Sequence, residues 1–113
     1  MLIEERVRNY LEGVFQEEGI PVVLEIPEVI PDTFVLFQLV DRGRENHINA
    51  VTLEFRSYAP SKYEAAELDE MVRDAMDDLH ASSDITCQLG GGNDAPDTTL
   101  KKYRYRCYYN LFY

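Results

Sequence analysis

The spacing of apolar residues changes several times along the chain, and each change marks a predicted element. In the first seventeen residues, apolar side chains such as Ile3, Val7 and Leu11 recur at helical spacing, with charged residues mostly on the other side. Gly19 and Pro21 follow, and this combination ends helices. The pattern therefore predicts one amphipathic helix at residues 2–17.

A second helix is predicted from SKYE at residues 61–64, which has the form of a capping box. Ser61 can accept a hydrogen bond from the amide of Glu64 while Glu64 reaches back to Ser61. Apolar residues then recur at helical spacing to about Leu79, and acidic residues fill the outer face. The predicted inward residues are Ala65, Leu68, Val72, Ala75, Met76 and Leu79.

Between the two helices the pattern predicts three strands. Residues 21–27, PVVLEIP, alternate between two prolines and predict a short strand near a sheet edge. Residues 33–40, TFVLFQLV, are apolar on both faces, which is typical of a central strand covered on both sides. The polar stretch 41–49 is predicted as the tip of a β-hairpin, because an alternating run follows at 51–56.

Two more strands are predicted near the end of the chain. Residues 84–91 alternate, and a loop rich in Gly, Asn, Asp and Pro at 90–98 separates them from the closing segment KKYRYRCYYNLFY at 101–113. The order is α-β-β-β-α-β-β in one domain, residues 1–113, without a repeat or linker. We therefore expect an α+β fold, with a mixed, mostly antiparallel sheet and both helices packed on it.

The net charge of −10 is spread unevenly. Helix 61–79 carries an acidic outer face that includes Glu67, Glu70, Asp74 and Asp77. Because neutralisation of phosphates supplies most non-specific affinity for nucleic acid, a chain this acidic is a poor general binder of DNA or RNA. The basic closing segment is the exception.

Strand parity separates the closing segment into two faces. Lys102, Arg104 and Arg106 share one face, while the other carries an aromatic row that we expect to join the core. The basic face is then available for an acidic partner. Two alternatives are open: it meets the acidic helix face of another copy, as in a head-to-tail ring, or it meets the helix of the same chain.

The remaining composition indicates a globular protein outside the membrane. Hydrophobic residues make up 45% of the chain, and no run approaches the roughly 18 to 20 apolar residues that span a bilayer. The start, MLIEERVRNYLEG, lacks the cationic and apolar regions of a signal peptide. We expect the protein to begin in a cytoplasm.

Candidate reactive residues are few. Cys87 and Cys107 are best interpreted as part-buried thiols, with a disulfide or metal pair as the alternative, and His47 and His80 have no metal-ligand spacing to them. GGGND at 90–94 lacks the lysine and hydroxyl residue of a phosphate loop. We expect no catalytic residue, no cofactor and no metal.

Three segments together resemble a family. RENHINAVTLEF at 44–55, SYAPSKYEAAELDEMVRDAM at 57–76 and DTTLKKYRYRCYYNLFY at 97–113 are similar to small tail-completion proteins from the head-to-tail gene clusters of siphophages and prophages of Gram-positive bacteria. The resemblance spans most of the chain and lies in the order of the segments and in their residue patterns.

The resemblance implies a tail terminator or head-tail joining protein with a small α/β fold. Such proteins form a six-membered ring on the tail tube, contact tube and connector proteins, and let DNA pass through an acidic lumen without specific binding. The implied location is the host cytoplasm during assembly and then the virion. Head-closure and minor capsid roles remain alternatives, as does a nucleic-acid binding module that uses the basic last strand.

On this interpretation the functional residues are interfacial rather than catalytic. The candidate surfaces are the hairpin tip, the acidic helix face, the 90–97 loop and the basic face of the last strand. The candidate residues are Arg42, Arg44, Glu45, Asn46, Glu67, Glu70, Asp74, Asp77, Lys102, Arg104 and Arg106.

Overall fold

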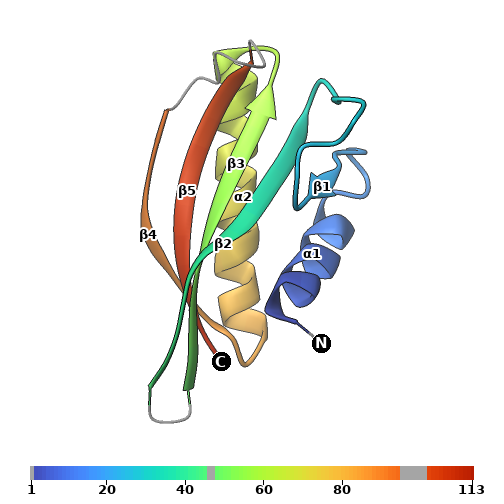
Figure 1. The fold of residues 1–113 in the computed structure, drawn as a ribbon. Helices are drawn as coiled ribbons and strands as arrows, with labels where there is room; N and C mark the ends of the chain where they lie inside the picture. Colours follow the sequence, from blue (N-terminus) through green and yellow to red (C-terminus); the bar gives the residue numbers. More distant parts are fainter. Residues whose placement is uncertain (1, 46–47, 95–101) are drawn as a thin grey trace.

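The computed structural model describes residues 2–45, 48–94 and 102–113. Within these residues the chain forms two helices and one five-stranded sheet, in the order α-β-β-β-α-β-β (Figure 1). The predicted α+β fold is therefore confirmed. The elements are α1 (Ile3–Val14), β1 (Val22–Val23), β2 (Phe34–Glu45), β3 (Ile48–Ala59), α2 (Lys62–Ser82), β4 (Thr86–Asp94) and β5 (Tyr103–Phe112).

The strand order in the sheet is β1-β2-β3-β5-β4. β1 pairs with β2 in parallel, and the three other pairs are antiparallel. β1 lies at an edge, as its flanking prolines predicted, but it contains only Val22 and Val23. The predicted central strand is β2, which is second from that edge, and the middle position belongs to β3. Coverage of β2 on both sides is confirmed for its first four residues, which are all buried.

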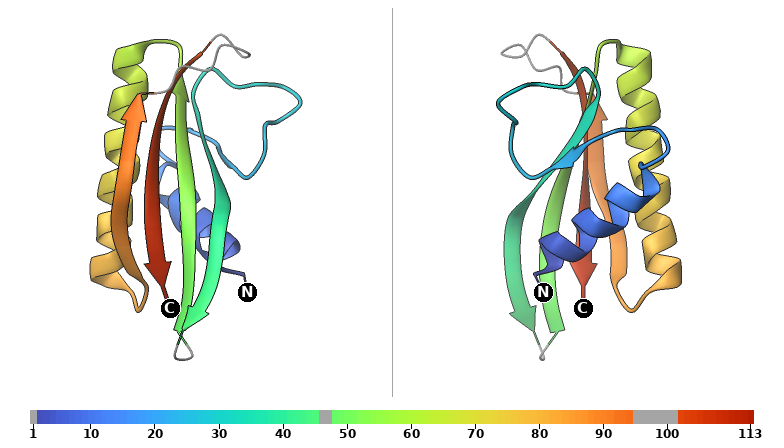
Figure 2. Two further views of the ribbon diagram at one scale, coloured as in Figure 1. Left: turned by 60° about the vertical axis from the view of Figure 1, so that its left-hand side comes forward. Right: turned by 90° about the vertical axis from the view of Figure 1, so that its right-hand side faces the viewer.

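Both helices pack on the same face of the sheet (Figure 2). Ile3, Val7 and Leu11 of α1 join the core, and so do the inward residues predicted for α2, all of which are buried. We call the other side of the sheet, which neither helix covers, the open face. It carries Gln38, Thr52, Glu54, Arg56, Tyr58, Arg104, Arg106, Tyr108 and Asn110.

The start of α2 follows the predicted capping box. The backbone amide of Glu64 donates to Ser61 Oγ at 3.2 Å, and Ser61 Oγ lies 3.1 Å from Glu64 Oε2. This side-chain contact replaces the predicted return bond to the Ser61 amide. α2 continues to Ser82, three residues past its predicted end. α1 ends at Val14, three residues before its own predicted end.

The hairpin between β2 and β3 is longer than predicted. Residues 41–45 and 48–49 were expected in its polar tip, yet they pair as strand up to Glu45 and Ile48. Cross-strand hydrogen bonds stabilise these residues in the strand, and their polar side chains can remain in water there. A bulge between Leu39 and Asp41 changes the register within β2.

The glycine-rich stretch at 90–94 is also strand, not the predicted loop. Gly91 pairs with Tyr108 and Gly92 with Cys107, so β4 runs on to Asp94. Gly91 has φ 141°, a backbone conformation that favours glycine, beside a bulge that follows Leu89. The rest of the predicted loop, 95–98, lies outside the described residues.

Candidate interaction surfaces

The basic residues of β5 lie on the open face. Arg104 and Arg106 stand beside β3, where Arg106 is opposite Arg56. The guanidinium of Arg104 donates to the hydroxyl of Tyr58 at 3.4 Å, with its carbon 5.9 Å from the centre of the tyrosine ring. Lys102, just before β5, donates to the carbonyl of Asp32 at 3.3 Å. The predicted grouping of these three residues on one side is thus present, and Arg56 joins it.

A buried carboxylate lies beside these arginines. Glu54 is 4% exposed and accepts hydrogen bonds from Gln38 Nε2 at 3.0 Å, from Tyr108 Oη at 2.9 Å and from Arg56 Nε. Burial alone would raise the pKa of Glu54, but the bonds from Tyr108, Arg56 and Gln38 and the charge of Arg56 outweigh it, so the pKa is lowered. The group holds one negative charge among the arginines of the open face.

The acidic residues of α2 lie on the opposite side of the sheet. Glu67, Glu70, Asp74 and Asp77 are all exposed. α2 packs against the aromatic face of β5, where the hydroxyl of Tyr109 donates to Asp77 at 3.3 Å. The alternative in which the basic face of β5 meets the helix of its own chain is therefore wrong, because the sheet separates the two.

The aromatic row of β5 only partly joins the core. Cys107, Tyr109 and Leu111 are buried as predicted, but Tyr105 is half-buried and Tyr103 is 43% exposed. Tyr109 packs edge-on against Phe55 at 6.1 Å between ring centres.

The hairpin candidates lie away from both charged surfaces. Arg42 and Arg44 are exposed, and Arg42 is 3.7 Å from Glu4 of α1, which places it on the helix side of the sheet. Glu45 ends β2. Asn46 lies outside the described residues, and so does His47.

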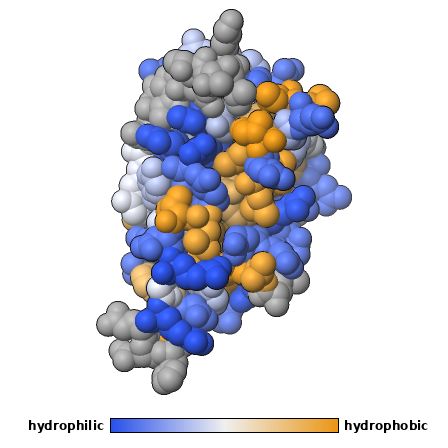
Figure 3. Space-filling view, viewed as in Figure 1, coloured by the Kyte–Doolittle hydropathy of each residue, from blue (hydrophilic) through white to orange (hydrophobic). Residues whose placement is uncertain are grey.

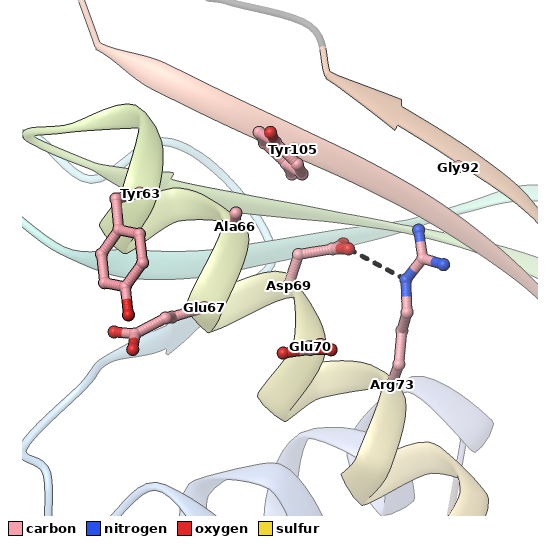
Figure 4. Close-up of a pocket in the computed structure, with 8 residues that line it drawn as sticks. All are labelled: Tyr63, Ala66, Glu67, Asp69, Glu70, Arg73, Gly92 and Tyr105. Carbon is pink, nitrogen blue, oxygen red and sulfur yellow. Dashed lines mark ion pairs between the residues drawn. The ribbon is translucent and has the colours of Figure 1, made fainter.

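An open groove of about 640 Å³ lies between α2 and the β4–β5 edge. Figure 4 shows Asp69 and Arg73 directed from α2 towards the strands, with Glu67 and Glu70 along the helix. Arg73 Nε is 2.9 Å from an Asp69 carboxylate oxygen, and burial raises the pKa of Asp69 in spite of this partner. The acidic rim of the groove suits a cationic side chain. Its full lining is Tyr63, Ala66, Glu67, Asp69, Glu70, Arg73, Gly92 and Tyr105.

Sequence reasoning missed the burial of Asp69 and Glu54. Asp69 is 5% exposed and lies within the apolar stripe of α2, four residues after Ala65 and three before Val72. This spacing could have indicated its burial, and so could Arg73 four residues later, an i,i+4 partner of opposite charge.

Both cysteines are free and buried on the helix side of the sheet. Cys87 is opposite Leu111 and Cys107 is opposite Gly92, so they do not face one another. Burial raises the pKa of Cys107 to about 12 and that of Cys87 to about 11, with nearby carboxylates adding to both shifts. Within the described ranges no three His, Cys, Asp or Glu residues gather as a metal site.

His80 contacts the edge of the sheet. Its Nδ1 accepts a hydrogen bond from the backbone amide of Cys87 at 3.1 Å. Because β4 is an edge strand, this contact satisfies an amide that points away from β5. His80 also lies in the last turn of α2, where a basic residue is favourable beside the helix dipole.

An exposed apolar segment joins β1 to β2. Leu24, Ile26, Val29 and Ile30 lie in it, and Val29 is 85% exposed. Figure 3 shows hydrophobic residues gathered at the upper right of the view, over this segment. Clustered exposed apolar residues mark sites of contact with other proteins, membranes or ligands.

The chain matches no protein-family model and no curated protein. Among the described residues, no helix is both long and apolar enough to cross a membrane.

Proposed function

We propose that the protein is a structural component of a phage tail, a terminator that assembles as a ring, caps the tail tube and joins it to the head. The proposal rests on the resemblance of its segments to tail-completion proteins and on one structural observation. The acidic face of α2 and the arginines of the open face lie on opposite sides of one sheet, so they do not neutralise each other within a chain.

A ring of subunits standing side by side makes use of this separation. The acidic helix layer can line the channel, where like charge keeps passing DNA from adhering. The open face and the exposed apolar segment 24–30 then remain for tube or connector proteins. The partners proposed are therefore further copies of the chain, the tail tube protein and a head-tail connector.

Sedimentation and negative-stain imaging over a range of concentrations, with and without tail-tube protein, test this function. We expect six-membered rings alone or on tube ends. A protein that associates with neither itself nor tubes under any of these conditions is not a terminator. A monomer in isolation does not count against the proposal, because such rings can close only on their target.

A nucleic-acid binding module is the second candidate, because Arg56, Arg104 and Arg106 share the open face with Tyr108. If that function holds, the protein binds a polyanion at moderate salt, and reversal of charge in Arg104→Glu with Arg106→Glu abolishes the binding. The matched control is Arg8→Glu with Arg42→Glu, which changes the net charge equally on the other side of the sheet. The absence of binding by the unmodified protein would exclude this candidate.

A further inference from the structure

Within the described residues the sheet has two edges along which no further strand pairs, and they lie on opposite sides. One is the outer edge of β4. The other is the distal part of β2, because β1 pairs only with Val35 and Leu36. Unpaired strand edges are templates for pairing with another chain.

Hydrogen-bonding parity shows which residues of β4 are directed outward. The amide of Cys87 bonds to His80 and so points away from β5. In an antiparallel ladder alternate residues point the same way, so the amide and carbonyl of Leu89 also point outward. Leu89 itself is 49% exposed.

Hydrogen-bonding parity also shows which residues of β2 are directed outward. The amide of Val35 donates to the carbonyl of Pro21 at 2.9 Å, which directs Val35 away from β3. Phe37 and Leu39 have the same parity, so their backbone groups also point away from β3. The bulge begins directly after Leu39. Leu39 is therefore the last outward-directed residue of the regular part of β2.

These two outward-directed leucines lie at the same level of the sheet. The register aligns Leu39 with Leu53, Leu53 with Tyr109 and Tyr109 with Leu89. A closed ring is generated by rotation without translation along its axis. If the strands run along that axis, Leu89 of one copy meets Leu39 of the next.

The strand directions also suit this contact. Each step from β2 to β3, to β5 and to β4 reverses direction, so β4 runs opposite to β2. Rotation about an axis along the strands preserves direction, so β4 meets the next copy's β2 as an antiparallel pair. The leucine side chains then lie on the helix side, where Leu39 packs against the core.

Charge distinguishes this pairing from a symmetric one. The register pairs Arg42 with Val51, Val51 with Leu111 and Leu111 with Cys87, so Arg42 and Cys87 lie at the same level of the sheet. Asp77 is near Cys87, because its carboxylate helps to raise the pKa of that thiol. In the pairing of β4 with β2, exposed Arg42 therefore approaches exposed Asp77 of the next copy. Pairing β4 with a second β4 would instead bring two copies of the acidic α2 face together, which like charge opposes.

We propose that copies of this chain associate edge to edge, with β4 of one copy pairing antiparallel with β2 of the next, centred on Leu89 and Leu39. The inference rests on the ring proposed above and assigns its subunit interface. The contact is heterologous: each copy offers two different edges, so successive copies continue one sheet around the ring.

Disulfide crosslinking tests this register. In a hydrogen-bonded antiparallel pair the two Cα atoms lie about 5.5 Å apart, which is within the range of a disulfide. Under mild oxidation we expect no crosslink from Leu39→Cys or Leu89→Cys alone. An equal mixture of the two should give crosslinked dimers, and the double variant should give a ladder that ends at the size of the ring. The single variants control for the native cysteines, which are buried.

Leu89→Pro supplies an independent test. It removes an outward amide and leaves the ladder with β5 intact, so circular dichroism should show a folded protein whose self-association is up to roughly tenfold weaker per interface. Leu89→Ala, which keeps the amide, is the matched control and should retain more of the association.

The outcomes separate this inference from the proposed function. Rings on tube ends without a Leu39–Leu89 crosslink would overturn the interface and leave the terminator function standing. A crosslinked ladder from a protein that never binds tubes would support the interface and contradict the terminator function. Crosslinking of Leu89→Cys alone would indicate symmetric β4 pairing and overturn the inference.

Discussion

Glu54 on β3 accepts a hydrogen bond from the hydroxyl of Tyr108 on β5 at 2.9 Å, on the face of the sheet that no helix covers. The same carboxylate accepts from Gln38 on β2, so one buried group ties three adjacent strands together. Arg56 supplies the compensating charge. On the open face this polar network lies beside a small buried apolar cluster of Phe34, Leu36 and Tyr58, whereas the helix side of the sheet is held by the main apolar core.

Glu54→Gln should destabilise the fold by about 1–3 kcal/mol, because it keeps the size of the side chain but removes the charge that Arg56 and Tyr108 bond to. Urea unfolding at pH 7 measures the loss of free energy. Glu25→Gln, at an exposed position, is the control and should have little effect. Equal stability of Glu54→Gln and the unmodified protein would contradict the role of the network.

The contribution of Glu54 should depend on pH in one direction. Its pKa in the folded protein lies below the ordinary value of 4.5, so the unfolded chain binds the proton more tightly. The stabilisation is thus complete above pH 4.5 and declines as the pH falls through the lower, folded pKa. The difference in unfolding free energy between the unmodified protein and Glu54→Gln should accordingly narrow below pH 4.5. A gap that widens on acidification would contradict the lowered pKa.

The thiols of Cys87 and Cys107 should resist alkylation in the native state. Their exposed fractions are 7% and 0%, and their raised pKa values, about 11 and about 12, keep them protonated at pH 8. A thiol reagent followed by mass spectrometry should find neither modified in the native protein and both modified in denaturant. Rapid native labelling of either cysteine at pH 8 would show that the sheet opens at that position.

The sequence predicted the parts of the fold that depend on local periodicity. The cap at Ser61, the inward residues of α2 and the burial of Tyr109 and Leu111 all follow from spacing along a single helix or strand. Such patterns act within a few residues, so they can be recognised without knowing what packs against them.

The missed features depend on partners distant in the chain. Gly90–Asp94 becomes strand because β5 pairs with it, and no local property of GGGND favours that outcome. The buried state of Glu54 needs Gln38 and Tyr108, which come from two other strands. The face that α2 covers depends on how the chain crosses the sheet. Because α2 packs on the aromatic side of β5, the basic side of that strand stays open.

His80→Ala should loosen the edge of the sheet without disturbing its interior. The variant leaves the outward amide of Cys87 to water, at a cost of about 0.5–1.5 kcal/mol. Hydrogen exchange measured by NMR should show faster exchange at the amide of Cys87. The amide of Gln88, which points towards β5, is the internal control and should be unchanged. Unchanged protection of Cys87 would mean that the bond to His80 contributes nothing to the edge.

Gly92→Ala should destabilise the protein, because a β-carbon there has no room. It would lie 2.6 Å from the carbonyl oxygen of Arg106 and would also meet the guanidinium of Arg73. The side chain of Arg73 can move, but the backbone of β5 cannot without straining the ladder, so we expect a loss of about 1–3 kcal/mol.

Gly43→Ala is the matched control for Gly92→Ala, because nothing lies within 4 Å of a β-carbon at that strand position. Thermal unfolding of the two variants should therefore separate the close contact at Gly92 from the general effect of replacing a glycine in a strand. We expect Gly43→Ala to be neutral or slightly stabilising, since alanine reduces the freedom of the unfolded chain. Equal melting temperatures for the two variants would mean that β4 does not approach α2 and β5 as closely as the pairing of Gly92 with Cys107 requires.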